Sequence, residues 1–259
     1  MALLDVSRVE ISYDDIPVVH DISFKIEPGG ILGMVGESGS GKSTVIKAAM
    51  GLLGKEGKVT KGNILYKNKN ILKMSMTEQR KLRGPEMGMI FQDTAASLCP
   101  IRKIQDQLYE AVLQHEKIEK SEIKERALEL FSKMKLENGE RILQSYPFEL
   151  SGGMNQRVGI MMAMVLKPDL LFADEPTSAL DVTVQAQVIR EMMKMREEYH
   201  TAIVMITHNI GVVEHMADKV AVMYKGRLVE YGETKEIIQN PKEEYTKKLM
   251  SSVLRINKG

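Results

Sequence analysis

The nine residues from Gly36 to Thr44 have the types and spacing that bind a phosphate group. They match the pattern G-x-x-x-x-G-K-[ST] without a mismatch. Glycines let the backbone point its N–H groups at an anion, and a helix that begins near Lys42 adds the positive end of its dipole. This loop therefore predicts a bound nucleoside triphosphate. Its predicted binding residues are Gly36, Glu37, Ser38, Gly39, Ser40, Gly41, Lys42, Ser43 and Thr44.

Within this pattern, known as a P-loop, two side chains have separate tasks. The Lys42 ammonium is predicted to neutralise the β- and γ-phosphates, and the Ser43 hydroxyl is predicted to coordinate Mg²⁺. The alternative is a glycine-rich turn that binds nothing. A strand, the loop and a helix are expected in the required order, which favours nucleotide binding.

A second set of reactive side chains follows two later apolar runs. Asp174 and Glu175 come after Leu170–Ala173, and His208 comes after Ala202–Ile206. Asp174 is predicted to hold Mg²⁺, and Glu175 to polarise a water for attack on the γ-phosphate. His208 is predicted to contact the γ-phosphate. The alternatives are a solvated acidic pair in a turn and a structural histidine.

Short buried strands must position these groups. Strands are expected where apolar residues run together or alternate with polar ones, at Leu3–Tyr13, Ile31–Val35, Gly62–Tyr66, Leu170–Ala173, Ala202–Ile206, Val220–Tyr224 and Leu228–Glu230. The runs at 170 and 202 are separated by a helical stretch from about Thr183 to Tyr199. This order predicts a parallel βαβ unit with ligands at the carboxyl ends of its strands.

After Gln92 the pattern changes to helices. Apolar residues recur on one helical face in two stretches: Ile104, Leu108, Ala111 and Val112, and then Ile123, Ala127, Leu130, Phe131 and Met134. Ser121 is expected to cap the second helix, with Glu122 in its first turn. The middle third of the chain therefore reads as a helical insertion.

Composition excludes several classes of protein. The 259 residues are 43% hydrophobic, enough for a packed core, and 36 basic against 35 acidic residues leave a net charge of +1. Strong electrostatic binding to nucleic acid or anionic lipid is therefore not expected.

A single cysteine, Cys99, excludes an internal disulfide and fits a reducing compartment, and a structural role is expected for it rather than metal ligation. Apolar runs are shorter than the roughly 20 residues of a spanning helix, and the N-terminus lacks a signal-peptide pattern, so a cytosolic location is expected.

The segment Leu150–Met154, followed by Gln156 and Arg157, resembles the signature motif of ATP-binding cassette (ABC) ATPases. It lies between the P-loop and the Asp174–Glu175 pair, and the resemblance covers nearly the whole chain. It implies an α/β P-loop NTPase fold with a RecA-like core, an antiparallel β-subdomain and an inserted α-helical subdomain. The implied single domain, 1–259, has its catalytic core and β-subdomain in 1–92 and 165–240, its helical subdomain with the signature motif in 93–164, and a C-terminal tail in 241–259.

The resemblance also implies roles for individual residues, with ATP and Mg²⁺ as the cofactors. Tyr13 is similar to the aromatic residue that stacks on adenine, although packing is an alternative. Gln92 resembles the Q-loop glutamine, which contacts Mg²⁺ and the attacking water. The implied catalytic residues are Glu175, His208 and Gln92, and the implied metal ligands are Ser43, Gln92 and Asp174.

Other roles lie across an interface with a second cassette. Ser151, Gly152 and Gly153 are implied to meet the γ-phosphate of ATP bound to the partner. Asp181 closes the segment Ser178–Asp181, which looks like the D-loop of the same interface. ATP would then hold two cassettes together, and hydrolysis would release them.

The chain looks like one branch of this family. Ala179–Gln187, Ser151–Arg157 and the tail segment Pro241–Lys247 are similar to the ATPases of oligopeptide, dipeptide and nickel importers. The sequence reaches Gly259 without a cysteine-containing tail, which together with Tyr146–Glu149 resembles the shorter nickel-import ATPase. Uptake of nickel or a metal chelate is therefore expected, with oligopeptide or dipeptide import as the alternative.

The importer resemblance implies several partners. They are a second, non-identical ATPase subunit, two transmembrane permease subunits and an extracytoplasmic substrate-binding protein, with the chain at the cytoplasmic face of the cell membrane. Nucleic acid is not an expected partner. A soluble ABC ATPase acting on DNA or ribosomes and a non-hydrolytic nucleotide binder are the less favoured hypotheses, because basic extensions are absent and Lys42, Asp174, Glu175 and His208 are all present.

Overall fold

The computed structural model describes residues 1–178 and 180–251, which divide into two compact units. We call Met1–Gln79 together with Ala202–Gly259 the terminal unit, and Arg80–Thr201 the central unit. Within the described residues, the search for a helix long and apolar enough to cross a membrane found none.

The terminal unit is built on strands in the order β5-β4-β1-β2-β10-β9-β3-β8. Strands β1, β2, β4 and β5 pair antiparallel, as do β9 and β10, whereas β3 pairs parallel with both β8 and β9. The strand bounds are β1 Leu4–Tyr13, β2 Ile16–Ile26, β3 Ile31–Val35, β4 Gly57–Tyr66, β5 Lys69–Asn70, β8 Ala202–Ile206, β9 Lys219–Tyr224 and β10 Arg227–Glu233. One part of this unit is thus antiparallel and another part parallel.

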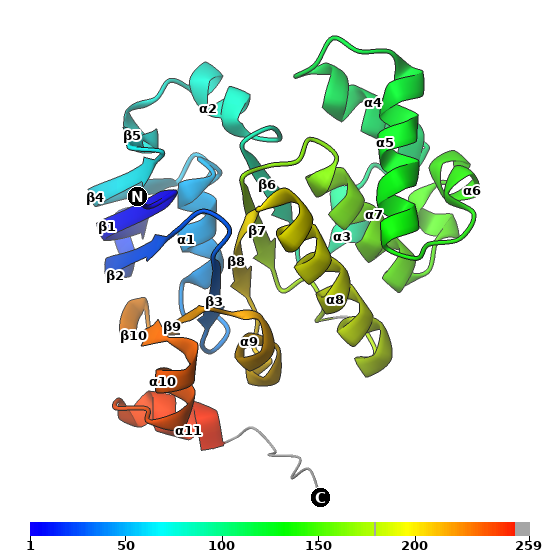
Figure 1. Cartoon of the computed structure of the whole chain (residues 1–259). Helices are drawn as coiled ribbons and strands as arrows, with labels where there is room; N and C mark the ends of the chain where they lie inside the picture. The colour runs from blue at the N-terminus through cyan, green and yellow to red at the C-terminus, as the bar shows by residue number, and fades with distance from the viewer. Residues whose placement is uncertain (179, 252–259) are drawn as a thin grey trace, which may run out of the picture. The chain divides into compact units, whose positions relative to one another are not determined.

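In the terminal unit, α1 follows the parallel strand β3 and α9 follows the parallel strand β8 (Figure 1). Helix α1 covers Lys42–Ala49, α9 covers Ile210–Met216, α10 covers Thr234–Gln239 and α11 covers Glu244–Ser251; the short η1 helix is Ile71–Lys73, and α2, Met76–Leu82, begins in this unit.

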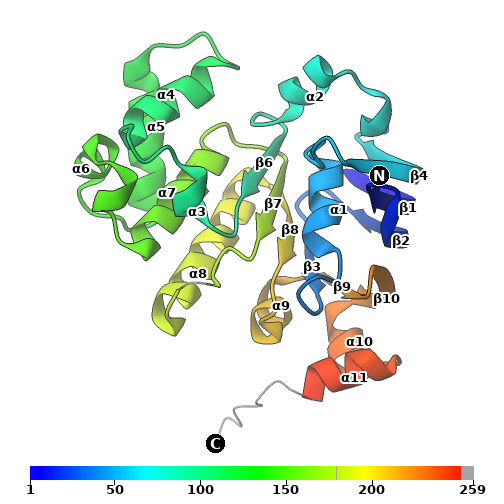
Figure 2. The same ribbon diagram turned by 180° about the vertical axis from the view of Figure 1, so that it is seen from behind.

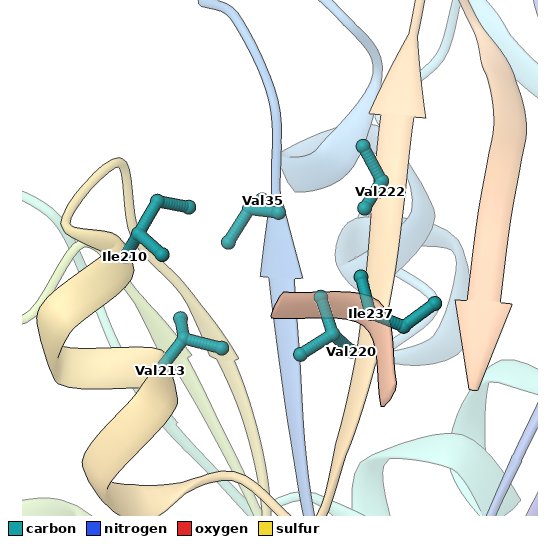
Figure 3. Close-up of a cluster of buried hydrophobic side chains, with 6 residues drawn as sticks. All are labelled: Val35, Ile210, Val213, Val220, Val222 and Ile237. Carbon is teal, nitrogen blue, oxygen red and sulfur yellow. The ribbon is translucent and has the colours of Figure 1, made fainter. Parts of the chain in front are cut away.

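A cluster of buried aliphatic side chains packs α9 and α10 against the parallel strands. Figure 3 shows its members Val35, Ile210, Val213, Val220, Val222 and Ile237. Tyr245, Leu249 and Met250 of α11 are partly buried against this cluster. Burial of apolar surface therefore holds the C-terminal helix onto the strands that lead to the P-loop.

The central unit has two parallel strands and a group of helices, seen from behind in Figure 2. The bounds are β6 Met87–Ile90, α3 Thr94–Ser97, α4 Ile104–Leu113, α5 Lys120–Lys133, α6 Gly139–Gln144, η2 Pro147–Glu149, α7 Gly152–Met164, β7 Leu170–Asp174 and α8 Val182–Tyr199. All five residues of β7 are buried. The unit contains the region 93–164 for which the sequence predicts helices.

The strand and helix expectations are largely confirmed. Strands β3 and β8 have the predicted bounds, β9 and β10 form the predicted strand, turn and strand, and the predicted apolar face of α5 is buried. Strands β7 and β8 belong to different units, so their parallel pairing stays a prediction.

The expected helix cap at Ser121 is wrong. Helix α5 begins at Lys120, and Glu119 occupies the N-cap position without a side-chain hydrogen bond. Glu122 instead accepts a 2.7 Å hydrogen bond from Arg126, one turn later. This ion pair supports the first turn of α5, and Ser121 lies inside that turn.

Candidate functional site

The P-loop connects β3 to α1 within the terminal unit. Gly36 has φ 145°, and a side chain would not fit there because its Cβ would lie 2.0 Å from the Met223 carbonyl oxygen. Gly41, with φ 97°, is the N-cap residue of α1. These left-handed backbone positions require glycine, so the spacing of the motif follows from the turn that its backbone makes.

Lys42 lies at the start of α1 and is only 5% exposed. Its Nζ donates hydrogen bonds to the carbonyl oxygens of Gly36 at 2.8 Å and Glu37 at 2.7 Å, and to Ser40 Oγ at 3.3 Å. The loop therefore wraps around its own lysine and places a buried positive charge beside the positive end of the α1 dipole. This arrangement fits a phosphate ligand, because both features favour an anion.

Two contacts from the C-terminal part of the terminal unit hold the P-loop. The Gly226 N–H donates to the Ser40 carbonyl oxygen at 3.1 Å, and the Glu37 N–H donates to Tyr245 Oη at 2.9 Å. The ring of Tyr245 stacks on that of Tyr224, with 4.2 Å between centroids. The sequence marks Tyr245 only as part of a tail motif, so its contact with the loop is a finding of the structure.

His208 lies at the same edge of the sheet as the P-loop. Strand β8 runs parallel to β3, and the Thr207 N–H donates to the Met34 carbonyl oxygen at 3.3 Å. His208 is exposed in the turn between β8 and α9, and Asn209 caps α9 by accepting from the Val212 N–H at 3.3 Å. The structure thus brings His208 and the P-loop to adjacent strand ends, as the predicted γ-phosphate contact requires.

Tyr13 ends β1 and lies opposite Gly57 of β4. A Cβ at Gly57 would lie 2.7 Å from Tyr13 Cε1, so the half-buried ring packs on the bare backbone of that glycine. Packing, the alternative for Tyr13, is therefore present in the structure, and adenine stacking stays a prediction.

Gln92 and Glu175 of the central unit lie together. Gln92 follows β6 and Glu175 follows β7, and Gln92 Nε2 donates to Glu175 Oε2 at 3.4 Å. The parallel pairing of β6 and β7 explains this contact, since it brings their carboxyl ends side by side. Asp174, the last residue of β7, is 7% exposed. Glu175 adopts φ 46°, a strained conformation that turns the chain sharply after the strand.

The signature segment begins α7. Ser151 is its N-cap residue and accepts a 3.3 Å hydrogen bond from the Met154 N–H. Ser151 and Gly152 are exposed, and a Cβ at Gly152 would meet no atom within 4 Å. At Gly153 a Cβ would lie 3.2 Å from Val184 of α8. The N-terminus of α7 is thus open at Gly152 and packed at Gly153.

Asp181 caps α8, accepting from the N–H groups of Thr183 and Val184 at 3.0 Å each. This helix cap is a local role of Asp181, and its place at a cassette interface stays a prediction. Ala179, which belongs to the expected D-loop, lies outside the described residues, as do residues 252–259 of the expected tail.

A buried contact that the sequence does not reveal joins the Q-loop region to the signature helix. Thr94 Oγ1 donates to Gln156 Oε1 at 2.8 Å, and a Cβ at Gly159 would lie 2.3 Å from Thr94 Cγ2. The Q-loop segment and α7 therefore pack at close range. The only sequence signals of this contact are a threonine two positions after Gln92 and a glycine inside a helix.

Cys99 has a structural environment. It is half-buried, and its backbone N–H and carbonyl both bond to the side-chain amide of Gln107, at 2.8 and 3.0 Å. In the described part of the chain no group of three or more His, Cys, Asp or Glu side chains could hold a metal ion. Gln107 thus holds the backbone of Cys99, and the structural role expected for this residue stays a prediction.

The chain matches two family models and resembles named transport proteins. The model described as "ABC transporter" matches residues 19–178, and that described as "Oligopeptide/dipeptide transporter, C-terminal region" matches residues 229–259. The dipeptide transport ATP-binding protein DppD of Lactococcus lactis is 42% identical, over 97% of this chain and 73% of its own length. The oligopeptide transport ATP-binding protein OppD of Escherichia coli is 40% identical, over 99% of this chain and 77% of its own length.

Solved structures of ABC ATP-binding proteins have a fold similar to that of this chain. The ATP-binding cassette MJ0796, in a dimeric post-hydrolysis state bound to ADP and phosphate, has a TM-score of 0.79 and 25% identity, covering 89% of this chain and 98% of that one. CbiO1 from Clostridium perfringens, part of an ABC transporter complex, has a TM-score of 0.80 and 28% identity, covering 92% of this chain and 91% of that one. The expected P-loop ABC ATPase fold is confirmed.

The P-loop, the Gln92–Glu175 pair and the signature helix are therefore parts of an ATP-binding cassette. Membership of its family makes the chain a peripheral membrane subunit whose ATPase activity is coupled to transport. The chain belongs to the ABC transporter family, as an ATP-binding subunit of the oligopeptide/dipeptide importer branch.

Proposed function

We propose that the chain powers the uptake of short peptides. The observation that carries this proposal is the match of residues 229–259 to the C-terminal region of oligopeptide/dipeptide transporters. The relatives DppD and OppD are named for dipeptide and oligopeptide transport, respectively. These findings favour peptide import, the alternative from the sequence, over the expected uptake of nickel or a metal chelate.

ATP is proposed to bind the terminal unit through the P-loop. The support is the buried Lys42 ammonium at the start of α1, which fits the β- and γ-phosphates, together with the glycine backbone of the loop. Tyr13 is proposed to stack on the adenine. Mg²⁺ would be held by Ser43, Gln92 and Asp174, and when bound it would withdraw electrons from the phosphate oxygens.

Glu175 is proposed to accept the proton of the attacking water. Its carboxylate already accepts a hydrogen bond from Gln92, which supports a shared task for the two side chains in orienting that water. Glu175 follows the buried strand β7 directly, at a sharp backbone turn with φ 46°. His208, exposed at the edge from which the P-loop leaves β3, is proposed to contact the γ-phosphate.

The signature segment is proposed to act on ATP bound by a second cassette. The exposed N–H groups at the start of α7 favour an anion, and Gly152 leaves room for close approach. Ser151, Gly152, Gly153 and Asp181 would then lie at an interface that ATP closes and hydrolysis opens. A non-identical ATPase is the proposed second subunit.

Two permease subunits and a binding protein outside the membrane complete the proposed importer, with the chain on the cytoplasmic face. The central unit exposes large apolar side chains that a permease would cover. Ile101 is 81% exposed and Phe148 is 71% exposed. Their segments are joined by the Ile104 N–H, which donates to the Ser145 carbonyl oxygen at 3.0 Å. Exposed apolar side chains on joined segments fit a protein interface.

Uptake measurements test the transported substrate. Deleting the chain's gene is expected to abolish uptake of a labelled dipeptide or pentapeptide and to leave uptake of radioactive Ni²⁺ unchanged. Wild-type chain should restore peptide uptake, and so should Glu197→Gln, which changes an exposed carboxylate on α8. Glu175→Gln should not restore it. Loss of nickel uptake with intact peptide uptake would overturn the proposal.

A further inference from the structure

We propose that Tyr245 of the C-terminal helix is a positioning residue for the ATP site, acting through the backbone of P-loop residue Glu37. The inference rests on the proposed binding of ATP by the P-loop. It assigns a task in nucleotide binding to residues 229–259, the region matched to the transporter C-terminal model.

The contact itself is direct. The Glu37 N–H donates to Tyr245 Oη at 2.9 Å, across 208 positions of sequence. Burial raises the pKa of the Tyr245 phenol above its ordinary value, so at neutral pH the acceptor is the uncharged hydroxyl. Glu37 is the second residue of the loop, directly after the glycine at which the chain leaves β3. A constraint at this point fixes the direction in which the loop starts.

Tyr245 is held through its ring and through the segment that precedes its helix. Its ring stacks on Tyr224 at the end of β9 and packs against the cluster shown in Figure 3. The Glu230 carboxylate of β10 accepts from the N–H groups of Lys242 and Glu243, at 2.9 and 3.2 Å, just before α11 begins. The hydroxyl therefore reaches the loop from a fixed ring rather than from a mobile side chain.

A second contact completes the support. Two residues after Tyr224, Gly226 donates its N–H to the Ser40 carbonyl oxygen at 3.1 Å. The aromatic pair and the turn between β9 and β10 thus hold the P-loop at two points, Glu37 and Ser40. Lys42 Nζ also donates to both of these residues, to the Glu37 carbonyl oxygen and to Ser40 Oγ.

Removing the hydroxyl would let the first half of the loop sample other conformations, and phosphate binding would then have to order it. The effect should fall on nucleotide affinity. The hydrolysis step should change little, because the proposed base, Glu175, is in the central unit. A rise in Kd and KM with nearly constant kcat is therefore the signature of this role.

The test compares Tyr245→Phe with Tyr231→Phe in the full chain. Tyr231 is a matched control in the same unit, since its hydroxyl also bonds to backbone, donating to the Lys25 carbonyl oxygen at 2.9 Å. Calorimetric titration with ADP should give a Kd raised about 3- to 10-fold in Tyr245→Phe and unchanged in Tyr231→Phe. The KM for ATP should rise by the same factor, with kcat within about 2-fold of wild type.

Other results would overturn the inference. One is an ADP Kd in Tyr245→Phe that equals that of Tyr231→Phe. Another is a fall in kcat at constant KM together with a lower melting temperature of the nucleotide-free protein, which would indicate a merely structural role. Lys42→Ala in the same series separates the two proposals: if it abolishes binding while Tyr245→Phe has no effect, only the role of Tyr245 fails. If Lys42→Ala binds ADP as wild type does, the P-loop assignment and this inference both fail.

Discussion

The two units differ in how firmly they hold their reactive groups. In the terminal unit the Lys42 ammonium is buried and bonded to three oxygens of its own loop, and the loop is anchored at Glu37 and Ser40. In the central unit Ser151 is exposed, and Glu175 is half-buried and accepts a 3.4 Å hydrogen bond from the exposed Gln92.

This difference separates binding from hydrolysis. A loop that is already ordered before it binds loses little conformational entropy on binding, so we expect the ATP affinity to come mainly from the terminal unit. The central unit supplies groups that local features hold, a helix cap at Ser151 and a strained turn at Glu175. We expect these more accessible groups to act only once nucleotide and a second cassette surround them.

Glu175→Gln is expected to have the largest effect and tests the central unit alone. The amide does not accept a proton at neutral pH, so kcat should fall by about 100- to 10,000-fold while the ATP affinity stays within about 2-fold. ATP should then hold two cassettes in a closed pair, visible by size-exclusion chromatography. Phosphate release measures kcat, with Glu197→Gln on the exposed face of α8 as the control. Turnover near that of wild type would remove Glu175 from the base role.

Lys42→Ala should instead weaken the ATP affinity that we expect from the terminal unit. Loss of the ammonium removes a charge-assisted contact with phosphate, and with it the hydrogen bonds to the carbonyl oxygens of Gly36 and Glu37. ATP affinity is expected to fall by about 30- to 100-fold, measured by calorimetric titration. Lys47→Ala, which changes an exposed lysine of the same helix, should bind ATP normally. Equal affinity in both variants would contradict a preformed phosphate site.

Glu230→Gln sharpens the comparison with the smallest effect, because it weakens the support of α11 and replaces no residue proposed to bind nucleotide or to act in hydrolysis. Burial of the Glu230 carboxyl favours its neutral form. The hydrogen bonds from the Lys242 backbone, the Thr246 hydroxyl and the Glu243 backbone, together with the charge of Lys242, outweigh burial and lower its pKa below the ordinary 4.5. The contribution of the carboxylate to the free energy of unfolding is therefore present above the unfolded-state pKa. It is lost as the pH falls through the folded-state pKa.

At about pH 7, Glu230→Gln should lower the free energy of unfolding by about 0.5 to 1.5 kcal/mol, and at about pH 4 this deficit should be smaller. Thermal unfolding at the two pH values measures this difference. Glu236→Gln removes an exposed carboxylate that pairs with Lys242 at 3.3 Å, and it should have little effect at either pH. A deficit in Glu230→Gln that persists undiminished at low pH would show that the carboxylate charge is not what stabilises the segment.

Much of the P-loop and its flanking elements could be predicted because their signals are local. Strand β3, the glycines and the start of α1 are consecutive in sequence, and each has its own steric reason. The cap at Ser121 was mispredicted because serine, glutamate and arginine compete near the same helix start. The ion pair between Glu122 and Arg126 forms in a helix that begins at Lys120.

The sequence by itself determined the phosphate loop, the acidic pair after β7 and the order of the motifs, since residue type and spacing within a few positions decide them. Only the tertiary structure decided which distant groups support the site. The bonds between Glu37 and Tyr245, and between Thr94 and Gln156, join residues 208 and 62 positions apart. Such contacts depend on how helices pack onto strands, because the hydrogen-bonding reach of a side chain is short compared with the distances that packing sets. Local spacing therefore identified the nucleotide loop, and packing selected the tyrosine that holds it.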